Sequence, residues 1–431
     1  MRAAHDLEGS TRLASTLEHL SDIDIASPAV YEAGIPHESF RLLRDNAPVH
    51  WHEWTDRSRG FWAITRHEDI VAISRDPATY SSAAEHVLLV DLDPDELKAR
   101  RSLLETDPPE HTRLRRLVSS AFTPGKVAEY EEATREIASG LLDDLIAEGG
   151  GDFVEAVSAP LPINVIVRIL GIPEEDAPFM LELSDHLVEG TSGAELDPAA
   201  YGNTTPLSLL PFGSPASHAL FEYGRKIGNE RREHPRDDLV TRLVQAEVEG
   251  ESLTDAEYCN FFQILVFAGN ETTRTAISQG LHALIESPDE LDRLRADRAL
   301  IPSAVEEILR WATPIMYFRR TAMEDTEIRG VPIARGDKVV MWYVSGNFDD
   351  RVLDDPLRFD VGRGRSEHVT FGGTGPHYCL GAWLARLELK VLLEELLDRD
   401  VRFESAGPPA RIRSNFVNGL RTLPVRVVTD A

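Results

Sequence analysis

Residues 371–389 read FGGTGPHYCLGAWLARLEL, and this stretch decides how the rest of the chain is interpreted. A glycine-rich loop leads to Cys379, and the apolar residues after it are spaced like one face of an α-helix. Those residues are Leu380, Trp383, Leu384, Leu387 and Val391. Cys379 therefore precedes a predicted helix N-terminus, where the helix dipole and free backbone N–H groups favour a thiolate over a thiol. A thiolate held there is a nucleophile or a metal ligand.

The two uses of a thiolate make different demands on the neighbouring residues. A nucleophile needs a base, and His377 is close along the loop but poorly aimed. The chain has one other cysteine, Cys259, which lies in an apolar stretch, so no zinc site with a CxxC pair can form. The glycines allow the backbone to approach something flat and large, and their N–H groups can point at the sulfur.

Composition and charge limit the class of protein. The length of 431 residues allows two or three domains. The longest apolar run, residues 261–269, is far shorter than the ~18–20 residues of a membrane span. The N-terminus has no apolar core typical of a signal peptide, so a soluble cytoplasmic protein without disulfides is expected. The net charge of −28 should repel nucleic acids and anionic membranes, and an acidic partner would need a local basic patch.

Local patterns predict more helix than strand. Residues 1–21 lack periodicity and are expected to form a loose tail. The pattern also breaks over residues 177–223, which contain the apolar but Gly-, Pro- and Ser-rich loop 191–217. Predicted helices cover residues 67–75, 107–124, 126–148, 161–170, 258–284 and 305–310. Predicted strands cover 48–55, 60–65, 315–320 and 424–428, with a hairpin formed by 327–333 and 338–344 around the turn 334–337.

The segment 107–124 reads DPPEHTRLRRLVSSAFTP and carries four basic residues. His111 and Arg115 are four apart and share one edge of the predicted helix, whereas Arg113 and Arg116 point to the opposite side. The predicted buried stripe consists of Leu114, Leu117, Val118 and Ala121.

Two further helices carry residues that bear on function, and one of them has residues that a purely structural helix would avoid. Residues 268–273 read AGNETT, in which Gly269 and the threonines are poor helix formers and Glu271 is a costly acid in an apolar stretch. In the helix 305–310, Glu307 and Arg310 lie on one face, which is a weak signal by itself.

Taken together, the cysteine loop, AGNETT and the Glu307–Arg310 pair resemble the cytochrome P-450 family, and the resemblance covers residues from about 22 to 428. It implies a mainly α fold with a smaller β-rich region, a triangular prism in which haem b lies between the long central helix and the helix after the cysteine. Residues 22–431 are then a single haem-thiolate monooxygenase domain. The chain departs from the usual family loop because Phe371 is eight residues before Cys379, one more than usual. This lengthened loop is similar to that of actinobacterial members that oxidise steroid side chains and methyl-branched lipids.

The resemblance also implies roles for individual residues. Cys379 is the axial ligand of the haem iron. Glu271 relays protons, Thr272 hydrogen-bonds the activated oxygen, and the small residues beside them leave room for dioxygen and substrate. The implied cofactor-binding residues are His111, Arg115, Ala268, Gly269, Arg320, Phe371, Gly372, His377, Cys379 and Gly381. A structural network beneath the haem is formed by Glu307, Arg310 and Arg363. The substrate pocket is formed by Val87, Leu88, Phe267, Ala268, Ile315, Met316 and Tyr317.

The implied reaction inserts one oxygen atom of O2 into a C–H bond, with electrons from NAD(P)H passed on by an acidic ferredoxin and its reductase. The uncharged pocket favours an apolar substrate: a methyl-branched lipid, a terpenoid or a steroid side chain. Alternatives are a tailoring hydroxylase or epoxidase of secondary metabolism, a peroxide-driven peroxygenase and a haem-binding sensor. The last two do not need the Glu271–Thr272 pair. The protein is expected to be a monomer, with loop 191–217 between two helices that cover the pocket. A solvated helix face and a ferredoxin-docking patch are equal alternatives for Arg113 and Arg116, with Arg100 and Arg101 nearby.

Overall fold

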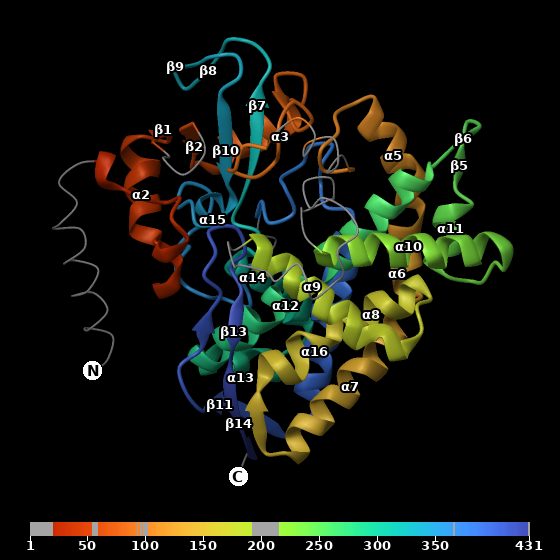
Figure 1. The fold of residues 1–431 in the computed structure, drawn as a ribbon. Coiled ribbons are helices and arrows are strands. Elements are labelled where there is room, and N and C mark those ends of the chain that lie inside the picture. Colours follow the sequence, from red (N-terminus) through yellow and green to blue (C-terminus); the bar gives the residue numbers. More distant parts are fainter. Residues whose placement is uncertain are drawn as a thin grey trace, which may run out of the picture.

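The computed structural model describes residues 20–53, 59–92, 94, 97, 102–191, 215–364 and 367–429. Helices make up most of this part of the chain, and a sheet lies at one end of it (Figure 1). The helices are α2 His37–Asn46, α3 His67–Arg75, α5 Glu110–Ser119, α6 Pro124–Ala128, α7 Glu131–Ala147, α8 Pro160–Leu170, α9 Ala177–Thr191, α10 Pro215–Glu233, α11 Leu239–Val244, α12 Asp255–Glu286, α13 Pro288–Ala296, α14 Ile301–Ala312, α15 Tyr343–Gly346 and α16 Ala382–Asp398. The strands are β1 Val49–His52, β2 Phe61–Ile64, β3 Tyr80–Ser81, β4 Gly150–Asp152, β5 Glu247–Val248, β6 Glu251–Ser252, β7 Tyr317–Ala322, β8 Thr326–Ile328, β9 Val331–Ile333, β10 Lys338–Trp342, β11 Val401–Ser405, β12 Ala410–Arg411, β13 Leu420–Thr422 and β14 Pro424–Thr429.

The main sheet has the strand order β1-β2-β10-β7-β3. Only the β2–β10 pair in it is parallel. All five residues of β10 are buried, and they alternate between two apolar clusters: Val340 and Trp342 face one, Val339 and Met341 the other. The predicted strands 48–55 and 60–65 correspond to β1 and β2, and the predicted strand 424–428 corresponds to β14.

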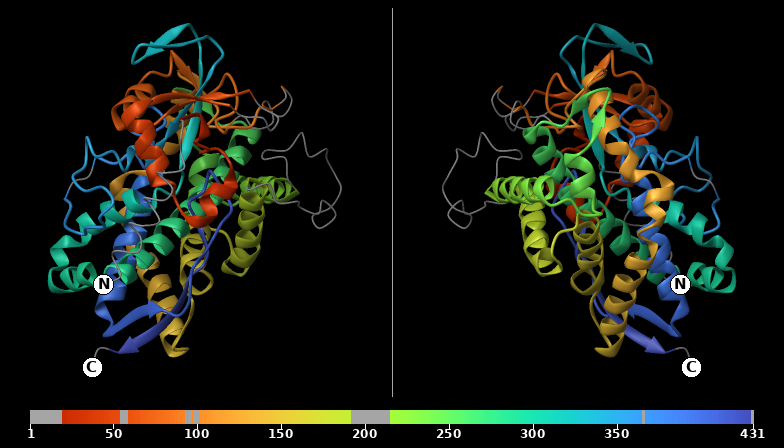
Figure 2. Two further views of the ribbon diagram at one scale, coloured as in Figure 1. Left: turned by 90° about the vertical axis from the view of Figure 1, so that its left-hand side faces the viewer. Right: turned by 90° about the vertical axis from the view of Figure 1, so that its right-hand side faces the viewer.

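The predicted hairpin between residues 327–333 and 338–344 is wrong. β8 instead pairs with β9 across Arg329 and Gly330, which have φ angles of 51° and 80°. Two successive left-handed residues match the twist of a two-residue hairpin, so the turn closes within 327–333. β10 is then free to pair with β7 and β2 in the main sheet. The β8–β9 hairpin lies beyond the sheet in both side views (Figure 2).

The two helices expected on either side of loop 191–217 are present, although the apolar pattern of the sequence breaks over residues 177–223. α9 and α10 occupy both ends of this range, and residues 192–214 lie outside the described part of the chain. The tail predicted over residues 1–21 falls outside it as well, except for Leu20 and Ser21. These two residues begin a short 3-10 helix whose Leu20 packs against a cluster of buried side chains.

The long helix α12 runs through the middle of the molecule (Figure 1) and packs against α8, α9, α10, α14 and α16. Its start is fixed by a capping box, in which the Thr254 side chain accepts from the Glu257 N–H and the Glu257 side chain accepts from the Thr254 N–H. The position of α12 places AGNETT deep in the interior. Among the described residues, no helix is long and apolar enough to cross a membrane.

Candidate active site

The loop before α16 presents Cys379 through a tightly constrained backbone. Gly372 and Gly373 have φ angles of 85° and 70°, in the left-handed region that glycine favours. The Cys379 N–H donates to the carbonyl oxygen of Phe371 at 2.9 Å, which closes the loop. A Cβ atom on Gly375 would lie 1.6 Å from the Ser74 carbonyl oxygen, so only glycine lets the loop pack against α3.

Two properties of Cys379 show what surrounds its sulfur. The residue has a large solvent-accessible surface. Burial among protein atoms nevertheless raises the pKa of its thiol, and the Gly381 N–H and the charges of Arg115 and Arg386 oppose this only in part. A side chain with both properties has protein around it but open space on one side. The Gly381 N–H before α16 favours the thiolate, as expected of a helix N-terminus, but burial outweighs this effect. A bound metal cation would deprotonate the thiol.

The apolar face predicted after the cysteine is only partly correct. Leu384, Leu387 and Val391 are buried, whereas Trp383 in the first turn of α16 is 49% exposed and lies beside the Arg386 guanidinium. The middle of α16 is enclosed by α7, α12 and α14, so its burial does not follow a single stripe.

Basic side chains from three segments gather near the cysteine loop. The rings of His111 on α5 and His377 have centroids 4.2 Å apart, and Arg115 Nη2 donates to the Tyr378 carbonyl oxygen at 2.6 Å. Burial, followed by the charge of Arg115, lowers the pKa of His111 to about 4. Burial, the charge of Arg320 on β7 and the His111 ring hold the pKa of His377 well below its ordinary value.

This basic cluster (His111, Arg115, Arg320 and His377) has unused hydrogen-bonding capacity. Both histidine Nε2 atoms are buried and have no hydrogen-bond partner among the described residues. Burial also lowers the pKa of the Arg115 and Arg320 guanidinium groups, which shows that their charges are poorly compensated. Buried donors and positive charges in this state fit an anionic ligand, and the two propionates of haem supply such groups.

On α12, Thr272 and Ala268 keep partial exposure although the helix is central. The Thr272 hydroxyl donates to the carbonyl oxygen of Ala268 at 2.7 Å, which leaves its oxygen lone pairs free to accept. Gly269 has a different use from the one expected. A Cβ atom there would lie 2.8 Å from Cδ1 of Ile166, so this glycine allows α8 to approach α12.

Glu271 lies on the buried side of α12 and is 1% exposed. Burial raises the pKa of its carboxyl to about 7, and the nearby Arg274 guanidinium opposes this shift. The Oε2 atom is 3.5 Å from Arg274 Nη1, whereas Oε1 has no hydrogen-bond partner among the described residues. Arg274 Nη1 also contacts Asp185 Oδ1 on α9 at 2.6 Å, and the Asp185 side chain is 44% exposed. A chain of charged groups therefore leads from the buried acid to the surface.

The structure brings Glu307, Arg310 and Arg363 together. Glu307 Oε2 accepts from Arg310 Nε at 2.7 Å and from Arg363 Nε at 3.0 Å. Its Oε1 accepts from Arg310 Nη2 at 2.8 Å and from the Asp360 N–H at 3.0 Å. The Glu307 and Arg310 side chains are both fully buried.

The residues predicted to form the substrate pocket fall into two groups. Val87, Met316 and Tyr317 are 4%, 0% and 3% exposed, and the last two belong to an apolar cluster with Trp342 and Phe416. Their side chains therefore face protein. The residues that keep partial exposure are Leu88, Phe267, Ala268 and Ile315.

Arg113 and Arg116, for which a docking patch and a solvated helix face were equal alternatives, both have acidic neighbours. Arg113 pairs with Glu257 and lies 3.7 Å from Glu251, and Arg116 lies 3.7 Å from Glu249. Glu249 and Glu251 border a groove between α5 and the β5–β6 hairpin. Together with Glu257 they offset both positive charges. Arg100 and Arg101 lie outside the described residues.

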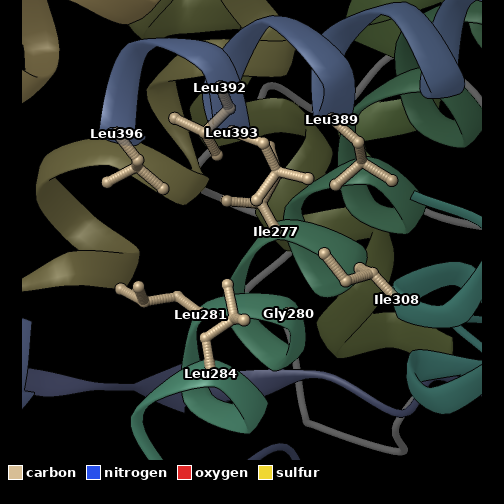
Figure 3. A pocket seen from close by; sticks show the side chains of 9 residues that line it. All are labelled: Ile277, Gly280, Leu281, Leu284, Ile308, Leu389, Leu392, Leu393 and Leu396. Atoms are coloured by element: carbon tan, nitrogen blue, oxygen red, sulfur yellow. The ribbon is translucent and has the colours of Figure 1, made fainter. Parts of the chain in front are cut away.

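Two other features of the described residues carry no site. A cavity of about 10 Å³ between α12, α14 and α16 is lined by aliphatic side chains, among them Ile277, Ile308 and Leu393 (Figure 3). At most it holds one water, which would find no polar side chain there. No group of three or more His, Cys, Asp or Glu residues within the described ranges could hold a metal ion.

The sequence interpretation missed three polar residues on α12 and α16. Arg274 follows Glu271 by three positions, and this spacing alone could have indicated the contact. Asn270 is fully buried, and its amide donates to Ser184 on α9 at 3.0 Å. Glu388 on α16 is buried with both carboxyl oxygens unpartnered among the described residues, and burial raises its pKa well above the ordinary value. Its place in the apolar run LELKVLL was the available signal.

Comparisons with known proteins agree with this geometry. The sequence model described as Cytochrome P450 matches residues 30–417. A steroid C26-monooxygenase of Mycobacterium tuberculosis is 37% identical over 410 residues, which cover 92% of this chain and 91% of the relative. A methyl-branched lipid omega-hydroxylase of the same organism is 36% identical over 417 residues, which cover 94% and 95%. A solved structure from Mycobacterium marinum, a cytochrome P450 in complex with pseudoionone, has a TM-score of 0.83 and 41% identity, covering 94% of this chain and 98% of that chain.

Fold, site and comparisons define a haem-thiolate monooxygenase, mainly α with a smaller β-rich region. The chain belongs to the cytochrome P450 family. The resemblance found in the sequence is therefore confirmed, together with the haem cofactor that it implied. The basic cluster and the open side of Cys379 fit that cofactor on the evidence of this chain's own residues.

Proposed function

We propose that this cytochrome P450 hydroxylates an apolar substrate at a terminal methyl group of a steroid side chain or of a methyl-branched lipid. The observation that carries the site assignment is the placement of Cys379. Its sulfur borders open space inside the protein, near a cluster of under-compensated basic side chains. Cys379 would hold the haem iron, and His111, Arg115, Arg320 and His377 would hold the propionates. Phe371, Gly372 and Gly381 would shape the loop beneath the ring.

The substrate class rests on two observations. The relatives that match over nine-tenths of the chain are named for steroid C26 oxidation and for omega-hydroxylation of methyl-branched lipids. The partly exposed residues of the predicted pocket, Leu88, Phe267, Ala268 and Ile315, carry no charge. An uncharged lining favours an apolar ligand that is oriented by few polar contacts. A terpenoid substrate would meet the same lining.

When bound, haem supplies the activation of dioxygen and the transfer of one oxygen atom to the substrate. Glu271 would hold a proton near neutral pH, because burial raises its pKa to about 7, and would release it into the site. Arg274 and Asp185 connect this carboxyl with the surface, from which it would be reprotonated. Thr272 has its hydroxyl hydrogen engaged with Ala268, so its oxygen would accept a hydrogen bond and orient a water.

Electrons would come singly from a ferredoxin and its NAD(P)H-dependent reductase, with the protein acting as a monomer. The ion pairs of Arg113 and Arg116 argue against these residues as the docking contact for an acidic ferredoxin. The surface around the exposed Trp383 lies closer to Cys379 along the chain and is the better candidate.

The decisive test of the ligand assignment is Cys379→His. The wild-type protein should show the red-shifted band of the reduced carbon-monoxide complex, and the variant should lose it while still binding haem. Cys259→Ser is the matched control, since Cys259 is buried on α12 and should leave the band unchanged. An unchanged band in Cys379→His would remove Cys379 as the ligand.

Titration of the wild-type protein with cholesterol, a methyl-branched fatty acid and pseudoionone then tests the substrate class. Displacement of water from the iron changes the haem spin state, so a saturable spectral shift reports binding near the iron. A response to pseudoionone alone would favour a terpenoid hydroxylase over the steroid and lipid assignment.

A further inference from the structure

The segment after β3, residues 85–91 (EHVLLVD), lies along the edge of the main sheet. β3 pairs with Thr321 and Ala322 of β7, and the Arg319 N–H donates to the Val87 carbonyl oxygen at 2.8 Å. The segment therefore continues the edge that β3 begins. We call residues 85–91 the strap. It carries the partly exposed Leu88, and it ends at Val90, which is 45% exposed, and at Asp91.

Two buried cations point from the sheet at the strap. Lys338 on β10 and Arg319 on β7 are 2% and 1% exposed. In the sheet register Arg319 faces Val340, two residues from Lys338, so both side chains lie on the same face. Lys338 Nζ donates to the Leu89 carbonyl oxygen at 3.3 Å, and Arg319 Nη1 to that of Leu88 at 3.4 Å.

One carboxylate neutralises both cations. Asp91 Oδ2 accepts from Lys338 Nζ at 2.8 Å, and its Oδ1 accepts from Arg319 Nη1 at 2.9 Å. Burial would raise the pKa of the Asp91 carboxyl, but the Lys338 hydrogen bond and the Arg319 charge hold it below the ordinary value. Glu85 is 3.9 Å from Arg319 and adds a weaker contact at the start of the strap. Both oxygens of Asp91 are thus occupied, each by a different strand of the sheet.

We call the contacts of Asp91 with Lys338 and Arg319 the clamp, and it lies next to the candidate active site. Arg320 follows Arg319 on β7 and points to the opposite face, where its charge acts on His111 and His377. Leu88 packs at the margin of the same apolar cluster as Ile315 and Phe318, and all three keep partial exposure. A shift of the strap would therefore move Leu88 relative to the substrate without displacing the basic cluster.

We propose that Asp91 is a specificity-determining positioning residue, which clamps the strap to Lys338 and Arg319 and so fixes where Leu88 meets the substrate. This rests on the proposed function, because it takes the apolar substrate to lie beside Leu88. Without the carboxylate, the two buried cations would keep carbonyl oxygens, among them that of Arg59, and only the weaker contact of Arg319 with Glu85. Poorly compensated buried charge is strongly unfavourable. The strap would yield rather than the sheet, because β10 is hydrogen-bonded on both edges and its residues are buried.

The test is Asp91→Asn in the haem-loaded enzyme, with pseudoionone, cholesterol and imidazole as probes. The spectral Kd of the apolar probe that binds wild type should rise roughly ten-fold, which corresponds to about 1.4 kcal/mol of binding free energy. The ratio of the products formed from this probe should also change, because Leu88 meets it differently. The Kd of imidazole, which reaches the iron without needing the strap, should stay within two-fold of wild type. Amide hydrogen exchange of residues 87–90 should be faster in Asp91→Asn than in wild type. Asp91→Glu keeps the carboxylate, so its affinity and exchange should lie between those of wild type and Asp91→Asn.

Asp45→Asn is the matched control. Asp45 is 33% exposed against 30% for Asp91 and also pairs with two arginines, Arg41 and Arg351, but it lies on α2. Its removal should change neither the probe affinities nor the exchange of the strap. Unaltered affinity and exchange in Asp91→Asn would overturn the proposal, and so would an equal loss of imidazole binding, which would mean a general structural role.

Failure of the proposed function gives a different result, because wild type itself would then show no saturable spectral shift with either apolar probe. The exchange measurement needs no substrate, so the clamp is tested even if neither apolar probe binds.

Discussion

Replacing Glu307 by glutamine should be among the most damaging single-atom changes in this protein. The carboxylate accepts four hydrogen bonds, two at each oxygen. Glutamine keeps one oxygen and turns the other into a donor. If the amide nitrogen takes the Oε2 position, it faces Arg310 Nε and Arg363 Nε, both of which are donors. If the amide nitrogen takes the Oε1 position, it faces Arg310 Nη2 and the Asp360 N–H, which are also donors. Neither orientation of the glutamine amide can therefore replace the carboxylate.

The magnitude follows from the burial of the network. Glu307 and Arg310 are fully buried, and breaking such a pair by removing one charge costs about 3–5 kcal/mol. A typical folded protein is stable by about 5–15 kcal/mol, so the loss is about a fifth of the stability or more.

The damage should reach the cysteine loop. Arg310 also holds the carbonyl oxygen of Asn347, whose side-chain oxygen accepts from the Val369 N–H. The Val369 carbonyl oxygen in turn accepts from Gly372 N–H.

Urea unfolding followed by tryptophan fluorescence, with the haem Soret band read in parallel, measures both effects. The control is Glu306→Gln on the same helix. Glu306 pairs with Arg386 and His368 but is 23% exposed, and its loss should cost only about 1 kcal/mol. Haem should be released before global unfolding in Glu307→Gln but not in Glu306→Gln. If the two variants unfold and lose haem alike, the reasoning from buried charge is refuted.

Two further predictions concern α12. Thr272→Ala should keep the substrate-dependent consumption of NAD(P)H but raise the yield of hydrogen peroxide roughly ten-fold, because the hydroxyl that orients water is gone. Thr273→Ala, at a buried neighbour, is the control, and tight coupling in both variants would count against the role of Thr272. Glu271→Gln should flatten the pH dependence of stability. The pKa of Glu271 is raised from 4.5 to about 7, so the native state retains a proton that the unfolded chain releases, and stability falls by roughly 3 kcal/mol as pH rises between these values. The glutamine variant should lack this decline in urea midpoints measured from pH 4.5 to 8, and a decline of equal size in both proteins would assign it to other groups.

The chemistry of the site was readable from short motifs, because each motif joins residue types that are costly without a use. Cys379 after a glycine loop and an acid within the apolar helix 258–284 predicted where the functional groups lie, and α12 has nearly the predicted bounds. Two runs rich in aromatic and β-branched residues, separated by a polar turn, predicted β1 and β2. The hairpin was mispaired because strand pairing depends on turn geometry, which Arg329 and Gly330 decide locally.

Other features depended on contacts between distant segments. Trp383 has the spacing of a buried residue, yet it is exposed. The burial of α16 is decided by the three helices α7, α12 and α14 that pack against it, and it does not follow one apolar stripe. Met316 and Tyr317 were expected in the pocket but pack into the cluster around Trp342. Arg113 and Arg116 form a basic helix face in the sequence pattern, but in the fold the β5–β6 hairpin places Glu251 and Glu249 next to them.

The sequence by itself determined the family and predicted the haem ligand Cys379 and the acid–alcohol pair Glu271 and Thr272, because these depend on short-range order along the chain. Only the tertiary structure decided which charges are compensated. Asp91 meets Lys338 and Arg319 from more than 200 positions away in the chain, and Asp185 meets Arg274 from another helix. Compensation of charge depends on distance and burial, and neither can be read from residue order.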